Sequence, residues 1–135
     1  MAHPYHHAES SARKFGGIPE EYLRFHEFLD RSKSHMADFR HRALRHHSEG
    51  IFLLEEFFGT TTVLSTGRVL PVRFIGEQHV LEDLGRIPTL QDWLGRIQPE
   101  SWMLGRRGES PVSLSASSAP APVARPTRGG STKSR

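Results

Sequence analysis

Histidine is the residue type in this sequence whose number and position best indicate chemistry. The chain has nine histidines in 135 residues, and eight of them come before residue 48. The ninth, His79, stands in the polar stretch 77–83, which also contains Glu82 and Asp83. Imidazole titrates near neutral pH and is the commonest metal ligand in proteins. The clustering therefore indicates a metal-binding or acid–base site, although it does not identify a reaction.

Four of these histidines fall in a segment that predicts one long helix, residues 34–58, with an apolar stripe at helical spacing. At about 100° per residue, His47 lies in the middle of that stripe. His46 and Glu49 fall on the flank beside the stripe, and His41 points roughly the opposite way. We therefore expect one flank of this helix to contribute to a site.

A metal site must combine several segments, because the histidines of one helix are too widely spaced to reach a single ion. The candidate ligands are His47, His46, His79, Glu49, His7 and His26. Two or three imidazoles with a carboxylate suit zinc, iron or manganese, and an open coordination position would allow water activation. For such a reaction, Glu82 or Asp83 is a candidate general base, and Arg42 is a candidate contact for an anionic substrate.

The sequence lacks the known motifs of metalloenzymes and hydrolases. His26-Glu27 lacks the second histidine of H-E-x-x-H, and there is no paired E-x-x-H, G-x-S-x-G or phosphate-loop motif. An alternative is that His47 is a core histidine and that the histidines and arginines of residues 40–47 form a polar network that fixes helix packing. The chain would then be a non-enzymatic interaction module, such as a phage or host accessory protein.

The charge is unevenly distributed along the chain. The net charge is +3, but residues 105–135 carry six basic residues and one acidic residue, so the body is about −2. A basic groove on the body is therefore not indicated, and nucleic acid is a candidate partner only through the tail. The tail is rich in Ser, Ala, Pro, Gly and Arg, which predicts disorder.

The absence of cysteine excludes disulfides and thiolate metal sites. No apolar run approaches the length of a membrane helix, and the N-terminal residues do not resemble a signal peptide. We therefore expect a cytoplasmic protein without a membrane span.

The pattern predicts a mainly α (α+β) fold, a small domain of about four to five helices with one β-hairpin and a disordered basic C-terminal tail. The expected domain covers residues 2–104 and the tail residues 105–135. The predicted elements are a helix from Pro4 to about Lys14, a helix starting at Pro19, the helix 34–58, a hairpin over 60–74, a short helix over 77–84 and a last helix with Thr89 as its N-cap.

Several blocks of the sequence resemble one family of short, functionally uncharacterised bacterial and phage-associated proteins. The matching blocks are His3-Pro4-Tyr5-His6-His7, the stretch from Asp38 to Phe52 that contains R-H-R-A-L-R-H-H-S-E-G-I-F, and the stretch from Gly76 to Pro88 that contains G-E-Q-H-V-L-E-D-L-G. Asp92-Trp93-Leu94 and Trp102-Met103 fit as well. The resemblance covers most of residues 3–103 and implies one recurring domain without an assigned activity.

The leading hypothesis from the sequence is a small helical domain that binds a divalent transition metal through His and Glu/Asp side chains. Its more specific version is that the domain uses the metal for hydrolysis. An anionic small molecule or a protein is the expected partner. The rival hypothesis is the metal-free interaction module.

Overall fold

The computed structural model describes residues 3–106, which divide into two compact units, one ending at Leu94 and one starting at Gly95. The α-helices are α1 (Pro4–Phe15), α2 (Leu23–Asp30), α3 (Ser48–Phe58), α4 (Val72–Leu84) and α5 (Leu90–Leu94). The strands are β1 (Thr61–Val63) and β2 (Val69–Pro71). Short 3₁₀ turns are η1 (Pro19–Glu21), η2 (Arg31–Ser34), η3 (Phe39–Leu44) and, in the second unit, η4 (Ser101–Leu104). The predicted fold class, mainly helical with one hairpin, is confirmed.

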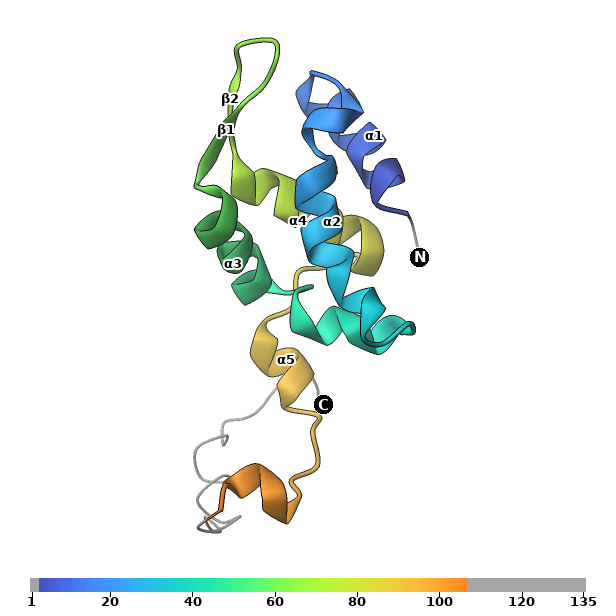
Figure 1. Ribbon diagram of the computed structural model, residues 1–135, viewed down its shortest axis with the longest axis vertical. Coiled ribbons are helices and arrows are strands. Elements are labelled where there is room, and N and C mark those ends of the chain that lie inside the picture. Colours follow the sequence, from blue (N-terminus) through green and yellow to red (C-terminus); the bar gives the residue numbers. More distant parts are fainter. Residues whose placement is uncertain (1–2, 107–135) are drawn as a thin grey trace, which may run out of the picture. The chain divides into compact units, whose positions relative to one another are not determined.

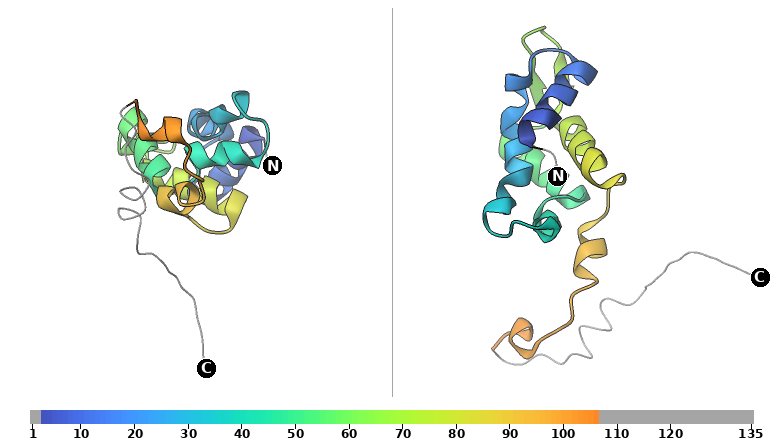
Figure 2. Two further views of the ribbon diagram at one scale, coloured as in Figure 1. Left: turned by 90° about the horizontal axis from the view of Figure 1, so that it is seen from below. Right: turned by 90° about the vertical axis from the view of Figure 1, so that its right-hand side faces the viewer.

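Four helices enclose the interior of the first unit. Helix α1 packs along α2, α4 lies against both of them, and α3 packs against α4 and α2 (Figures 1 and 2). The two strands form an antiparallel hairpin with Thr62 opposite Leu70, and β2 leads directly into α4. The hairpin therefore fixes where α4 begins.

The apolar core lies between these helices near the hairpin. We use this name for the buried side chains Ala8, Phe15, Tyr22, Phe25, Phe28, Leu29, Leu54, Leu64, Leu70, Val72 and Ile75. Gly76 lets α3 approach α4 closely, because a Cβ at this position would come within 3.2–3.3 Å of Ile51 and Leu54 side-chain atoms. Burial of apolar surface of this kind is the main favourable term in folding.

The predicted continuous helix over 34–58 is wrong. The chain forms the turn η3, bends, and starts a new helix at Ser48. His47 is the N-cap of α3, with an extended backbone (φ −164°, ψ 174°) and a side chain that accepts a hydrogen bond from the Gly50 N–H. A local side-chain cap of this kind competes with helix continuation, so the helical period does not run through His47.

The hairpin is shorter than predicted and α4 is longer. The strands stop at Pro71, and Val72, Arg73 and Phe74, which the sequence pattern assigned to the second strand, form the first turn of α4. Proline cannot donate to a strand ladder, whereas it suits the residue before a helix. Near the other end of the unit, the prediction that Thr89 caps the last helix is confirmed, because its Oγ1 accepts from the Asp92 N–H at 3.1 Å.

The predicted disorder concerns residues 105–135, and residues 107–135 lie outside the described part of the chain. The boundary at residue 104 stays a prediction. Within residues 3–106, no helix is long and apolar enough to span a membrane.

Candidate metal centre

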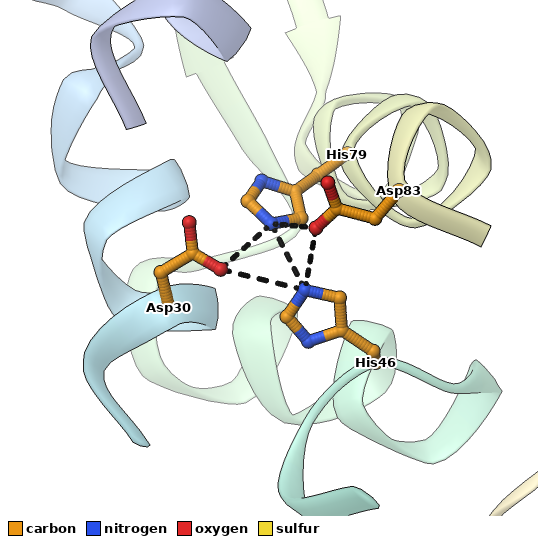
Figure 3. A group of neighbouring side chains, drawn as sticks. All are labelled: Asp30, His46, His79 and Asp83. Carbon is orange, nitrogen blue, oxygen red and sulfur yellow. Dashed lines mark hydrogen bonds and ion pairs between the residues drawn. The ribbon is translucent and has the colours of Figure 1, made fainter. Parts of the chain in front are cut away.

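Four buried side chains from three segments converge at one point in the first unit (Figure 3). Asp30 is the last residue of α2, His46 lies between η3 and α3, and His79 and Asp83 lie one turn apart on α4. Each of the four side chains is at most 3% exposed. We call this group the Asp/His cluster.

Five of the six separations between the donor atoms of the Asp/His cluster are close to those of a tetrahedral metal site, and all six are within 4.8 Å. His46 Nε2 lies 2.9 Å from Asp83 Oδ2, 3.1 Å from His79 Nε2 and 3.4 Å from Asp30 Oδ1. His79 Nε2 lies 3.2 Å from Asp30 Oδ1 and 3.3 Å from Asp83 Oδ2. Four ligands bound to one zinc ion at 2.0–2.1 Å are separated by about 3.3 Å in a tetrahedron. The cluster could therefore hold a metal ion with little movement.

Local structure fixes the direction of each donor. The His79 and Asp83 side chains share one face of α4 because they are four residues apart. His46 is held by its backbone, whose N–H donates to Arg42 O at 2.8 Å and whose carbonyl accepts from Trp93 Nε1 at 3.1 Å. The bend before α3 thus places the His46 imidazole against α4.

The two carboxylates of the cluster are held in the ionised form. Burial alone would raise the pKa of Asp83, but hydrogen bonds from His46, His7 and His79 lower it far below its usual range. The pKa of Asp30 is likewise lowered, because contacts with His46 and His79 outweigh its burial. Two ionised carboxylates in one buried cluster require positive charge beside them.

Burial lowers the pKa of His46, but hydrogen bonds to Asp30 and Asp83 outweigh it and leave the pKa raised. The pKa of His7 is raised in the same way by Asp83 and Glu82. In the absence of a cation, protons on these imidazoles therefore supply the balancing charge. A divalent cation would supply it instead.

A second set of polar side chains surrounds the cluster on the side of α1. We call it the outer layer; its members are His7, Ser11, His26, Gln78 and Glu82. The His7 ring packs against the His79 ring with the centroids 4.0 Å apart and the planes tilted by 33°, and His7 Nε2 lies 3.3 Å from Asp83 Oδ1. Its Nδ1 lies 2.8 Å from Glu82 Oε1.

The structure brings together only some of the predicted ligands. His46 and His79 lie in the cluster with Asp83, the predicted general base. His7 and His26 lie in the outer layer, as does Glu82, the other predicted base.

His47 and Glu49 are placed elsewhere. The His47 imidazole caps α3 and its Nε2 contacts Ala43 O at 3.0 Å. The Glu49 side chain is 53% exposed and accepts from the Leu90 N–H at 2.8 Å.

The predicted anion contact Arg42 lies at the edge of the cluster. Its Nη2 is 4.0 Å from Asp83 Oδ1, and its side chain is 15% exposed. His41, expected to point away, is buried, with its Nδ1 3.0 Å from Ser32 Oγ and its ring edge-on to His46. The expectation for His41 was wrong because η3 has three residues per turn, so its side chains point in other directions than they would in an α-helix.

Asp30 is the cluster member that the sequence analysis missed. A usable signal was present, since His26 and Asp30 repeat the spacing of His79 and Asp83, an H-x-x-x-D pair on each of two helices. Residues four apart share a helix face, so two such pairs on packed helices can meet at one point.

Comparison with known proteins gives a family and no activity. Neither the curated proteins nor the solved structures contain a significant match to the chain. A model of one domain family matches residues 2–103. The chain therefore belongs to the family described as Domain of unknown function (DUF6915).

Proposed function

We propose that this domain binds one divalent transition-metal ion, with zinc preferred, through Asp30, His46, His79 and Asp83. The observation that carries the proposal is the convergence of two imidazole nitrogens and two carboxylate oxygens, with five donor–donor separations between 2.9 and 3.4 Å. Mixed nitrogen and oxygen donors in a tetrahedron suit zinc better than calcium or magnesium. The two carboxylates would neutralise the ion.

The burial of the cluster supports a structural role for the ion. A catalytic zinc site keeps one position open for water, whereas a structural site has four protein ligands and is closed. Here four donors are available and all are nearly inaccessible to solvent. The ion would join α2, the bend before α3, and α4, which are distant in the sequence. Metal-dependent hydrolysis is less favoured, because it needs an open coordination position for water.

The test is elemental analysis of the untagged protein, purified without chelator or nickel resin. We expect about one zinc per chain, and loss of the metal in the Asp30→Ala and His46→Ala variants. His41→Ala is the matched control, because His41 is also buried and contacts His46 without belonging to the cluster. A folded wild-type protein that takes up no zinc, iron or manganese on titration would contradict the proposal.

The second candidate function is the metal-free interaction module. It is favoured by one observation: the Asp/His cluster is internally paired without a metal, since His46 contacts Asp83 and His79 contacts Asp30. The polar interior would then serve only to specify helix packing. Thermal unfolding separates the two candidates, because a strong chelator lowers Tm if the metal is present and leaves it unchanged if the network is metal-free.

A further inference from the structure

His79 reaches α1 through a line of hydrogen bonds on the side away from the cluster. Its Nδ1 lies 2.9 Å from His26 Nδ1, and His26 Nε2 lies 2.8 Å from Ser11 Oγ. Ser11 in turn contacts the Gln78 side-chain carbonyl and, at 3.0 Å, the backbone carbonyl of His7. All of these side chains are buried. The direction of each hydrogen bond therefore depends on its neighbours and not on water.

The direction is set at the far end of the line, by Glu82. Gln78 Nε2 lies 2.9 Å from Glu82 Oε2 and 3.2 Å from His7 O. A carboxylate and a backbone carbonyl can only accept hydrogen bonds, so this atom of Gln78 must be the donating amide nitrogen. The oxygen of Gln78 therefore faces Ser11, and it too can only accept.

Ser11 has one hydroxyl hydrogen and two acceptors that compete for it, Gln78 Oε1 and His7 O. Whichever of them receives the hydrogen, none remains for His26. His26 Nε2 must therefore carry a hydrogen and donate it to Ser11 Oγ.

The same reasoning continues to the metal centre. His26 is fully buried, and its two ring nitrogens face Ser11 Oγ and His79 Nδ1. Neither nitrogen contacts a carboxylate that would offset the cost of burying an imidazolium, so the ring is neutral. A neutral imidazole with hydrogen on Nε2 accepts through Nδ1. His79 Nδ1 must then be the donor in its contact with His26.

From these directions we infer that His26 is a positioning residue: it accepts the Nδ1 hydrogen of His79 and so leaves Nε2, which faces the other three members of the Asp/His cluster, as the nitrogen through which His79 would bind the ion. Metal-binding histidines commonly donate their second ring N–H to an acceptor that fixes the ring, and here that acceptor is another histidine. The inference rests on the proposed function and deepens it. It assigns His26, predicted as a ligand from the sequence, a role one step away from the ion.

The tautomers can be measured by two-bond ¹H–¹⁵N NMR correlations on protein labelled with ¹⁵N-histidine. We expect His79 to carry hydrogen on Nδ1 and His26 to carry it on Nε2 alone, both with and without zinc. Hydrogen on Nδ1 of His26, or metal bound through Nδ1 of His79, would overturn the inference. This measurement uses the wild-type chain and does not depend on a variant that folds.

A matched pair of serine variants gives the second readout. Ser11→Ala should weaken zinc binding about 10–100-fold, as removal of such supporting partners typically does. Ser32→Ala is the control, because Ser32 is also buried and contacts a histidine ring and a backbone carbonyl, those of His41. An unchanged zinc affinity in Ser11→Ala would contradict the inference.

The two proposals fail in different ways. A wild-type chain that binds no metal overturns the proposed function, and the tautomers of the metal-free protein then still decide whether the hydrogen-bond line has the inferred direction. A wild-type chain that binds zinc while Ser11→Ala binds it equally well overturns only the role of the line.

Discussion

The helices of this domain bury two unlike interiors, the apolar core and the Asp/His cluster with its outer layer. In α4 the two interiors follow each other along the helix: Val72 and Ile75 belong to the core, and His79 and Asp83 to the cluster. In α2 they occupy adjacent stripes, where Leu29 packs in the core beside the buried Asp30. Close packing and burial of apolar surface are enough to stabilise the apolar core. In the Asp/His cluster and its outer layer, each polar group depends on the direction of its neighbour's hydrogen bond.

The difference has a thermodynamic consequence. Truncating an apolar side chain removes contacts in proportion to its size, and the surrounding atoms relax in part. Removing one member of a buried charged network leaves its partners uncompensated, which costs more than the lost contact itself. Variants in the two interiors should therefore differ both in stability and in metal content.

The largest effect is expected from Asp83→Ala. This change removes the carboxylate that His7, His46 and His79 share and leaves their buried polar groups without an acceptor. We expect a loss of about 3–5 kcal/mol in the free energy of unfolding, together with loss of metal. Urea denaturation and elemental analysis measure the two effects.

The control for this variant is Asp38→Ala, which removes an exposed carboxylate that pairs with Arg40 and caps η3. It should lower the stability much less than Asp83→Ala does and leave the metal content unchanged. Similar losses of stability in both aspartate variants would show that the buried cluster contributes no more to the free energy of unfolding than an exposed carboxylate does.

Leu54→Ala tests the other interior. Leu54 is fully buried between α3 and α4, and its truncation should cost about 3 kcal/mol in the free energy of unfolding. Because Leu54 contributes no polar atom, the folded variant should keep its full metal content. Loss of the metal from folded Leu54→Ala would mean that the two interiors are not separable.

A smaller effect is expected from His47→Ala. The side chain caps α3 and lies outside the cluster, so its loss should cost about 1 kcal/mol in the free energy of unfolding and leave metal binding intact. His47→Ser should restore most of the stability, because serine is also a good N-cap. If His47→Ser lost the metal, the sequence-based assignment of His47 as a ligand would be supported against the present one.

The smallest expected effect is the pH dependence of the stability, which needs no substitution in the chain. In metal-free protein, the raised pKa values of His7 and His46 give stability that is present below the ordinary value of 6.5 and is lost as the pH rises through the folded values. The lowered pKa of His26 gives stability that is present above 6.5 and is lost as the pH falls. These opposite slopes predict a stability maximum near pH 6.5.

Bound zinc should reduce the decline above pH 6.5, because a metal ligated by His46 replaces the proton of His46 and leaves only the contribution of His7. Thermal unfolding between pH 5 and 9, with and without zinc, measures this difference. Identical profiles in the two conditions would count against ligation by His46.

Features with local causes were predictable from the sequence. Pro4 marks the start of α1, and Thr89 with Asp92 marks the start of α5, because proline and capping side chains act on their immediate neighbours. The break before α3 was missed, since His47 is an uncommon N-cap and the apolar spacing around it imitates a continuous helix.

The candidate site was predictable by residue type and only partly by position. His46, His79 and Asp83 were recognised as residues that could do chemistry, but Asp30 was not. Asp30 follows the apolar sequence Phe28-Leu29 at the end of a helix, where an aspartate is usually exposed. Its burial depends on the approach of α4, which no local pattern reveals.

The sequence by itself determined that the domain is mainly helical, that it has one hairpin, and that histidines are the candidate residues for a site. These properties follow from periodicity, turn residues and composition, which act over a few residues. The tertiary structure decided which side chains share the site, because His26 and His79 are 53 residues apart and meet only when α2 packs on α4. It also decided the division of roles, since an imidazole becomes a candidate ligand, a helix cap or a positioning residue according to the atoms its two nitrogens face.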